Sequence, residues 1–235
     1  MVLFFDLNIY MLVSHTKKFI YVKTMKTAGT STECWLERYC LPPNTEDVGA
    51  HSRALTMTEH GIVGGRYKKV SAGDRFYNHM PCHEIADQLP GEWREYYKFT
   101  NTRNPWDRMV SMWWNEVMNY PPEFFERPFG FLQKRFSQWA KSDLAMTRML
   151  AERPNYCVGD QYVLDGVIRY EHLEEDLREL AGKLDLDYEP SDFPTYKSDW
   201  RKRSESYQDY YIDQDTIDIV AVGSAFEVNQ FGYTF

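Results

Sequence analysis

The stretch FIYVKTMKTAGTSTECWL, residues 19–36, passes from a short apolar run through a polar turn into a segment with helical spacing. The apolar run predicts a buried strand, and the segment from about Thr30 to Tyr39 predicts a helix. A helix that begins directly after a strand directs its first backbone N–H groups and the positive end of its dipole into the turn. The stretch therefore predicts an anion-binding turn at the carboxyl end of a strand.

Two further segments repeat the order of strand, turn and helix. YYKFTNTR, residues 96–103, predicts a buried strand, and the helix expected after it has Asn104 as its N-cap and Pro105 in its first position. VLDGVIRYEHLEEDLRELAGKLDL, residues 163–186, predicts another strand and an amphipathic helix. Alternating strands and helices predict an α/β protein, a P-loop-like three-layer fold with a central, mostly parallel sheet flanked by helices.

Shorter helices are expected between and after these units. NHMPCHEIADQLP predicts a short helix with Pro81 near its first turn, and FGFLQKRFSQWAKSD has apolar residues at helical spacing. DQDTIDIVAVGSAFEVNQFGYTF, residues 213–235, predicts one more helix followed by an aromatic tail. These segments fit the helical layers of an α/β fold.

The length of 235 residues suits one domain, and we expect residues 1–235 to form it. An insert at about residues 40–75 is rich in Pro, Gly and polar residues and predicts a substrate loop or lid. The opening MVLFFDLNIYMLV contains Asp6, lacks a basic leader and is too short to cross a bilayer, so we expect a strand or hairpin. The protein is accordingly expected to be cytoplasmic, without a membrane anchor.

Composition limits the classes of partner. The chain has 27 Lys and Arg against 35 Asp and Glu, a net charge of -8, which argues against general binding to nucleic acid or to an anionic membrane. Any anion site must therefore be local. The four cysteines form no CxxC pair and no dense cluster, which favours a reducing compartment over a zinc ribbon or a disulfide framework.

The loop after residue 22 differs from the phosphate loop of nucleotide kinases. That loop reads GxxxxGK[ST], with its lysine directly after the last glycine. Here Lys26 precedes Gly29 by three residues, and the loop has no earlier glycine. ATP chemistry through that motif is disfavoured, and a nucleotide or small-molecule kinase is kept as the alternative in the same fold.

KTMKTAGTS instead resembles the 5′-phosphosulfate loop of sulfotransferases that use 3′-phosphoadenosine 5′-phosphosulfate (PAPS). TNTRNPWDRMVS resembles the 3′-phosphate motif of the same family, in which an arginine at a strand end is followed eight residues later by a serine. VIRYEHLEEDL and the terminal FGYTF are similar to the Golgi-type carbohydrate sulfotransferase group (sulfotransferase family 2-like) and its bacterial and viral relatives. The resemblance spans about residues 17–235, with the motifs in matching order.

The resemblance implies roles for two sets of residues. Lys26 would bridge the 5′-phosphate and the sulfuryl group and neutralise charge on the leaving phosphate, which is electrostatic catalysis. Lys23 either faces the donor or is solvated. Donor-binding residues implied by the motifs are Lys26, Thr27, Ala28, Gly29, Thr30 and Ser31 for the 5′ end and Arg103, Ser111, Arg203 and Ser204 for the 3′-phosphate. For the basic turn at residues 201–203, a plain surface turn or a contact with an acidic acceptor are the alternatives.

Transfer to a hydroxyl requires a base within hydrogen-bond reach of the acceptor. His79 is the first candidate, because related carbohydrate sulfotransferases carry a His, or in other branches a Glu, in this region; His83 and Glu84 come next. The spacing of His79, Cys82 and His83 also permits a metal interpretation, but Pro81 disfavours a regular helix through both histidines, and HExxH is absent. We expect no metal requirement.

The leading hypothesis is an enzyme that moves a sulfuryl group in line from PAPS to an acceptor hydroxyl and leaves adenosine 3′,5′-bisphosphate (PAP). The acceptor is expected to be a carbohydrate or a small molecule, bound by the insert, the aromatic stretch at residues 112–129 and the basic turn. A module that binds the bisphosphate or a glycan without catalysis is the alternative from another class.

Overall fold

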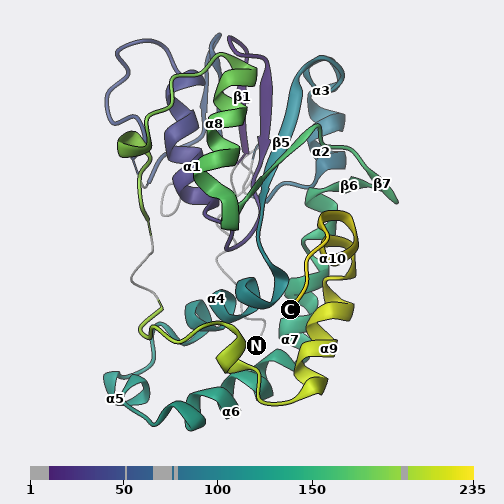
Figure 1. The fold of residues 1–235 in the computed structure, drawn as a ribbon. Helices are drawn as coiled ribbons and strands as arrows, with labels where there is room; N and C mark the ends of the chain where they lie inside the picture. Colours follow the sequence, from purple (N-terminus) through teal and green to yellow (C-terminus); the bar gives the residue numbers. More distant parts are fainter. Residues whose placement is uncertain (1–10, 51, 66–75, 77–78, 197–200) are drawn as a thin grey trace, which may run out of the picture. The chain divides into compact units, whose positions relative to one another are not determined.

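The computed structural model describes residues 11–50, 52–65, 76, 79–196 and 201–235 (Figure 1). These residues divide into two compact units. The first unit comprises residues 1–101 and 154–196, and the second comprises residues 102–153 and 197–235. Each unit is described separately below, and the prediction of one domain over residues 1–235 stays a prediction.

The first unit contains a six-stranded sheet with the order β3-β4-β1-β2-β5-β8. Its strands are β1 (Met11–Ser14), β2 (Phe19–Val22), β3 (Thr56–Met57), β4 (Gly61–Val63), β5 (Tyr97–Thr102, which continues into the second unit) and β8 (Gly166–Arg169). A separate two-stranded ribbon consists of β6 (Cys157–Val158) and β7 (Gln161–Tyr162). All residues of β1 and β2 are buried, as expected for central strands of a sheet covered on both faces.

Strand pairing makes the sheet mixed, whereas the sequence predicted a mostly parallel one. β2 pairs in parallel with β5, with Val22 opposite Thr100. β1 pairs antiparallel with both β2 and β4, and β3 pairs antiparallel with β4. The chain reverses between β1 and β2 within residues 15–18, and so short a connection permits only antiparallel pairing. The α/β class is confirmed, and the described end of the opening segment forms a strand, β1, that pairs with β2.

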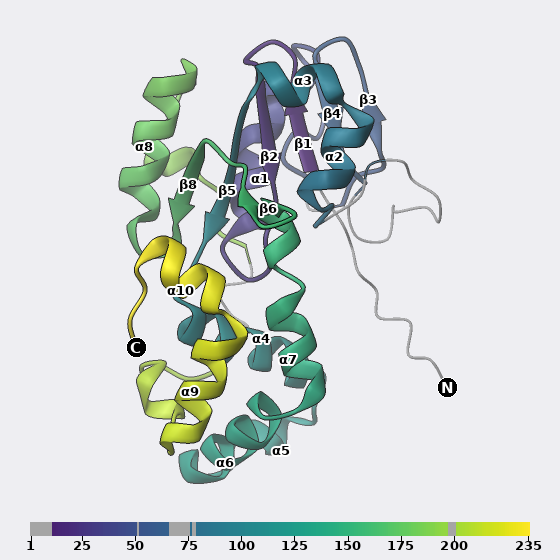
Figure 2. The same ribbon diagram turned by 90° about the vertical axis from the view of Figure 1, so that its right-hand side faces the viewer.

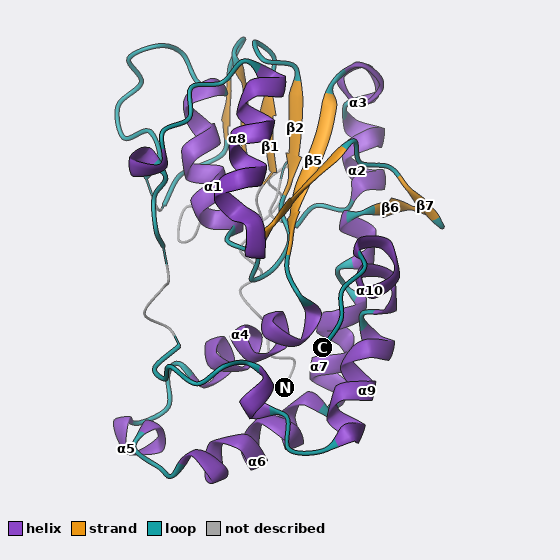
Figure 3. Ribbon diagram, in the orientation of Figure 1, coloured by secondary structure: helices purple, strands orange, loops and turns teal. Residues whose placement is uncertain are grey.

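Helices cover both faces of this sheet. Figures 1 and 3 show α1 and α8 on one face and α2 and α3 on the other, and the turned view in Figure 2 agrees. The bounds of these helices are α1 Gly29–Leu36, α2 Cys82–Gln88, α3 Pro90–Glu95 and α8 Leu173–Leu184. The three layers of the prediction are therefore present in the first unit.

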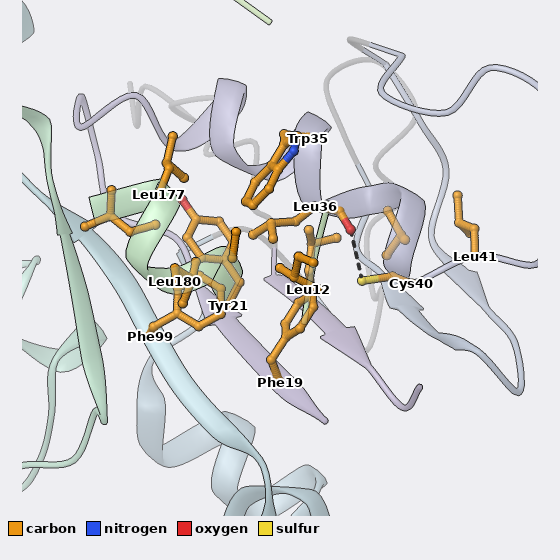
Figure 4. Packing of buried hydrophobic residues seen from close by; sticks show 14 residues of the cluster. Leu12, Phe19, Tyr21, Trp35, Leu36, Cys40, Leu41, Phe99, Leu177 and Leu180 are labelled. Atoms are coloured by element: carbon orange, nitrogen blue, oxygen red, sulfur yellow. Dashed lines mark hydrogen bonds between the residues drawn. The ribbon is translucent and has the colours of Figure 1, made fainter. Parts of the chain in front are cut away.

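The hydrophobic core of the first unit lies between the sheet and the helices α1 and α8 (Figure 4). Trp35 on α1, Phe99 on β5 and Leu177 on α8 are fully buried members of it. Tyr188 and Phe193, which follow α8, pack their rings against Trp35. The chain after α8 thus returns over α1, and Tyr196 donates its N–H to Ser31 Oγ, 3.2 Å away.

The predicted insert at residues 40–75 is only partly irregular. Residues 56–63 form the β3–β4 hairpin, which extends the sheet beyond β1. A Cβ on Gly61 would lie 2.1 Å from the carbonyl oxygen of Val13, so only glycine lets these strands pair so closely. Residues 51 and 66–75 of the insert lie outside the described residues. Residues 1–10 of the opening segment also lie outside them.

The described part of the second unit is helical. Its helices are α4 (Pro105–Val117), α5 (Pro122–Phe125), α6 (Phe129–Ala140), α7 (Asp143–Leu150), α9 (Gln214–Gly223) and α10 (Ala225–Phe231). Trp113 and Trp114 of α4 contact Phe136 or Tyr210 through aromatic rings. The sequence predicted one helix in the last segment, but it breaks into α9 and α10 at Ser224.

A buried charge cluster lies among the helices of the second unit. Arg108 of α4 is fully buried, and its Nη2 lies 2.7 Å from Glu227 Oε1 on α10. Its Nη1 lies 3.9 Å from Glu152 Oε2 after α7. A buried charge is tolerated only when it is paired, so Arg108 requires these two acids, and its ion pairs link α4 to α10 and to the segment after α7.

Helix α4 begins as the sequence predicted. Asn104 Oδ1 accepts hydrogen bonds from the N–H groups of Trp106 and Asp107, at 3.0 and 3.4 Å, and Pro105 occupies the first turn. The Nδ2 of Asn104 also donates to the carbonyl of Thr234, 2.9 Å away. One side chain thus caps α4 and holds the segment after α10.

We expect Asn104→Ala to lower the free energy of unfolding by about 2 kcal/mol, about 1 for the cap and about 1 for the bond to Thr234. Ser142→Ala is the control for a cap, because Ser142 accepts from Ala145 N–H at the start of α7 and its other bond, to the carbonyl of Trp139, lies within the same turn. It should cost about 1 kcal/mol. Urea denaturation followed by circular dichroism measures both, and equal losses would contradict the double role of Asn104.

Candidate active site

The loop between β2 and α1 has an unusual backbone. Lys26 and Ala28 have φ angles of 62° and 66°, in the left-handed region that non-glycine residues rarely adopt. The carbonyl of Ala28 accepts from Ser31 and Thr32, so α1 begins immediately after it. By helix geometry, the amides of Gly29 and Thr30 in the first turn have no intrahelical acceptor. The loop therefore presents backbone donors and a helix dipole to an anion.

Gly29 is required by a close approach within the protein. A Cβ at this position would lie 2.9 Å from Lys23 Cγ and 3.2 Å from the Tyr21 hydroxyl. The resemblance implies that Gly29 meets the donor, and the structure shows the Lys23 side chain packed against the start of α1. Both reasons for glycine are compatible, because they concern different sides of the loop.

Lys23 forms a buried ion pair with Glu33. Its Nζ lies 2.9 Å from Glu33 Oε2, and the two side chains are 5% and 0% exposed. Lys23 is therefore not solvated, which corrects one of the two alternatives given for it. The pair joins the end of β2 to the second turn of α1 and closes the base of the anion loop.

A hydrogen-bonded network of buried side chains continues from this pair. The Tyr21 hydroxyl donates to Asn101 Oδ1 at 2.6 Å, and Asn101 Nδ2 donates to Thr32 Oγ1 at 3.1 Å. Thr24 donates to the carbonyl of Asn101 at 2.6 Å. Burial, followed by the charge of Glu33, raises the pKa of Tyr21 well above its usual value, so the hydroxyl keeps its proton. The ends of β2 and β5 are thereby fixed against α1.

Some side chains of the predicted loop are bonded within the protein, and others are partly exposed to solvent. Thr27 is fully buried, and its hydroxyl bonds to Thr24, so its contribution to a ligand is limited to its backbone. Ser31 Oγ accepts from the backbone of Tyr196. Lys26 is partly exposed at the apex of the turn. Lys26 and the first amides of α1 are thus the groups placed to meet an anion.

His79 is hydrogen-bonded to the backbone directly after β2, where this loop begins. Its Nδ1 lies 2.9 Å from the carbonyl oxygen of Lys23, and the ring is partly buried. Since a carbonyl can only accept, Nδ1 carries the proton, and Nε2 of the neutral ring is the basic nitrogen. The backbone of His79 has a φ of 54°. Strain of this kind persists where the surroundings hold a residue in place.

The other candidate bases lie on α2. His83 is exposed and Glu84 is partly exposed. Cys82 is buried and donates to the carbonyl of Asn155, and burial raises the pKa of its thiol. Within the described ranges, no group of three or more His, Cys, Asp or Glu side chains could hold a metal ion.

The predicted 3′-phosphate residues lie in the second unit. Arg103 donates through Nε and Nη2 to Asp107 Oδ2, at 2.9 and 2.7 Å, and Arg201 Nη1 donates to Asp107 Oδ1 at 3.3 Å. Ser111 is partly exposed on α4. The structure therefore joins Arg103 to Arg201, which the sequence had not singled out as a donor-binding residue.

Arg203 and Ser204 are placed differently from Arg201. The guanidinium of Arg203 donates twice to Glu205 Oε1, at 2.9 and 2.7 Å, and lies over the ring of Phe129. Ser204 is exposed. The role of these two residues at the 3′-phosphate remains a prediction.

Sequence reasoning missed Glu33, Asn101, Asp107 and Arg201 as parts of the site. The sequence held one signal for Glu33, which is the only charged residue of the segment that forms α1. In the structure that helix is buried throughout, so its one charge needs a partner. Asp107 follows Arg103 by four residues, a spacing at which an acid and an arginine often pair, although Arg103 lies just before α4. The partners of Asn101 and Arg201 come from distant segments, so no local pattern indicates them.

Comparison with known proteins identifies the class. The model of the sulfotransferase family matches residues 10–233, nearly the whole chain. The chain therefore belongs to the sulfotransferase family and is a sulfotransferase enzyme, as the sequence motifs predicted. A search of curated proteins found no match. In the part of the chain that the structure describes, no helix is long and apolar enough to cross a membrane.

We expect Lys23→Met to lower the free energy of unfolding by about 3 kcal/mol, because it leaves the buried Glu33 carboxylate without its lysine. Adding Glu33→Gln should recover at least about 1 kcal/mol, since the buried charge is then gone. Denaturant unfolding followed by tryptophan fluorescence measures both variants.

Arg178→Met is the matched control for this pair. Arg178 and Glu174 form an ion pair on α8 with side chains 60% and 64% exposed. An exposed pair contributes about 0.5 kcal/mol or less. If Lys23→Met lowered the free energy of unfolding no more than Arg178→Met does, the buried ion pair would not stabilise the loop.

Proposed function

We propose that the enzyme transfers a sulfuryl group from PAPS to an acceptor hydroxyl on a carbohydrate or a small molecule. The observation that carries the proposal is the bond between His79 Nδ1 and the carbonyl of Lys23. This bond holds His79, with its basic Nε2, at the end of β2 from which the anion loop starts. Sulfuryl transfer requires a base for the acceptor hydroxyl next to an anion site for the donor.

The donor would bind through its 5′-phosphosulfate at the loop. The amides of Gly29 and Thr30 would donate to phosphate oxygens, and Lys26 would contact the bridging region between phosphate and sulfur. As the bond from sulfur to the phosphate oxygen breaks, negative charge grows on that oxygen, and Lys26 neutralises it. Lysine and amides supply the charge stabilisation, so the proposal gives no role to a metal ion.

The acceptor would attack sulfur from the side opposite the leaving phosphate. Its hydroxyl oxygen forms the new bond to sulfur while its proton passes to Nε2 of His79. The products are a sulfate ester and PAP, and His79 afterwards releases its proton to solvent. Because Nδ1 keeps its bond to Lys23, the ring holds the same orientation in both charge states.

The 3′-phosphate of the donor is assigned to Arg103 and Ser111, with Arg203 and Ser204 as further candidates. This assignment rests on the resemblance of TNTRNPWDRMVS to the family's motif. A planar guanidinium recognises phosphate through forked hydrogen bonds, and a serine hydroxyl adds another. The kinase alternative is disfavoured by the family match and by the position of Lys26.

We expect calorimetric titration to detect binding of PAP and no comparable binding of ATP with Mg²⁺. Lys26→Ala and Arg103→Ala should each weaken PAP binding at least about tenfold, since each removes a charge-assisted contact. Lys134→Ala, an exposed lysine of α6, is the control and should leave binding unchanged. Tight binding of ATP with Mg²⁺ in place of PAP would point to the kinase alternative.

We expect His79→Ala to lower the rate of sulfuryl transfer by a factor of about 100 or more while PAP affinity stays the same. His83→Ala is the matched control, because His83 lies four residues away on the exposed surface of α2, and it should keep the wild-type rate. Labelled PAPS with a panel of monosaccharides, disaccharides and simple phenols supplies the assay.

Two outcomes would count against this mechanism. Equal rates for His79→Ala and the wild type would remove histidine as the base. Binding of PAP without transfer to any member of the panel would favour the alternative of a module that binds nucleotide without catalysis.

A further inference from the structure

A single carboxylate in the second unit holds two arginines. Asp107 Oδ2 accepts two hydrogen bonds from Arg103, four residues earlier, and Oδ1 accepts one from Arg201, 94 residues later. The side chains of Arg103, Asp107 and Arg201 are 10%, 15% and 26% exposed. The three groups are thus largely shielded from solvent, which strengthens their electrostatic interaction.

Asp107 is shared by two arginines. Its ion pairs with Arg103 and Arg201 bring two guanidinium groups to one carboxylate. Without Asp107 the two arginines would repel each other, and each long side chain would regain its rotamer freedom. Asp107 therefore neutralises part of the positive charge but holds the two guanidinium groups close to each other.

Arg201 is also held from other directions. It donates to the backbone carbonyl of Glu205, and its guanidinium lies 5.3 Å from the centre of the Tyr210 ring. The carboxylate of Glu205 accepts from Arg203 instead. Glu205 thus pairs with Arg203, whereas Asp107 is the carboxylate that Arg103 and Arg201 share.

We propose that Asp107 is a positioning residue that presents Arg103 and Arg201 together to the 3′-phosphate of the donor. The inference rests on the proposed function, which assigns that phosphate to Arg103, and it adds Arg201 as the second arginine in place of Arg203. A dianionic phosphate fits a preorganised pair of guanidinium groups better than two mobile ones. Asp107 touches no ligand in this role; it acts through the arginines.

The test compares two nucleotides that differ only in the 3′-phosphate. Calorimetric titration with PAP and with adenosine 5′-monophosphate gives the ratio of their affinities for each variant of the full chain. Asp107→Asn should lower PAP affinity about tenfold or more, with the monophosphate unchanged, because asparagine lacks the negative charge and one of the two acceptor oxygens. Arg201→Ala should lower the ratio likewise, and by more than Arg203→Ala does.

Glu205→Gln is the matched control for Asp107→Asn. It makes the same chemical change at the acid that faces Arg203, and it keeps the backbone carbonyl that Arg201 uses. We expect it to leave the ratio of affinities unchanged. Asp107→Glu, which retains the carboxylate, should keep most of the preference for PAP. If residue 107 only stabilised the fold, the ratio of the two affinities would not depend on whether its side chain carries a charge.

The outcomes separate the two levels of the argument. A wild-type protein that binds neither nucleotide overturns the proposed function and this inference with it. A wild-type protein that prefers PAP, with Asp107→Asn keeping that preference, overturns the positioning role alone. Should Asp107→Asn fail to fold, Arg201→Ala against Arg203→Ala decides, since equal effects of these two variants overturn the assignment.

Discussion

The buried ion pair between Lys23 and Glu33 is the constraint on which the candidate site depends. It connects the first residue after β2 to the second turn of α1, so the chain between them must form a closed loop of fixed size. Gly29 packs against the same lysine, and the backbone carbonyl of Lys23 holds His79. One residue therefore sets the strand end, the start of the helix and the orientation of the histidine.

The two anion sites that we propose differ in how the positive charge is held. At the β2–α1 loop the charge is spread over backbone amides and one lysine, so it depends on the path of the main chain. On α4 it resides in guanidinium groups, which depend on a carboxylate for their direction. Both arrangements are local, as the acidic net charge of -8 requires.

Much of the fold follows from local patterns in the sequence. The strand Phe19–Val22 and the start of α4 at Pro105 were predictable because an apolar run and an Asn-Pro cap depend only on neighbouring residues. The antiparallel pairing of β1 with β4 was not, because it brings together residues about fifty positions apart. The break at Ser224 was missed since helical spacing continues across it.

The predictions for the site rest on contiguous motifs. Lys26 to Ser31 and Arg103 to Ser111 are such motifs, and both lie within the residues that the family model matches. Which arginine of the basic turn joins Arg103 depends on the reach of Asp107, a tertiary contact that composition cannot reveal. Likewise, the burial of Lys23 depends on α1 covering it, while its sequence neighbours permit a solvated side chain.

The cysteines offer a practical consequence. All four cysteines of the chain lie within its described part and are buried, and none takes part in a disulfide. Burial raises the pKa of Cys40 and Cys82, so their thiols stay protonated and are poor nucleophiles. A cysteine engineered onto the surface would therefore react selectively with a maleimide dye. Energy transfer between dyes on the two compact units could then follow their separation in solution without first removing any native thiol.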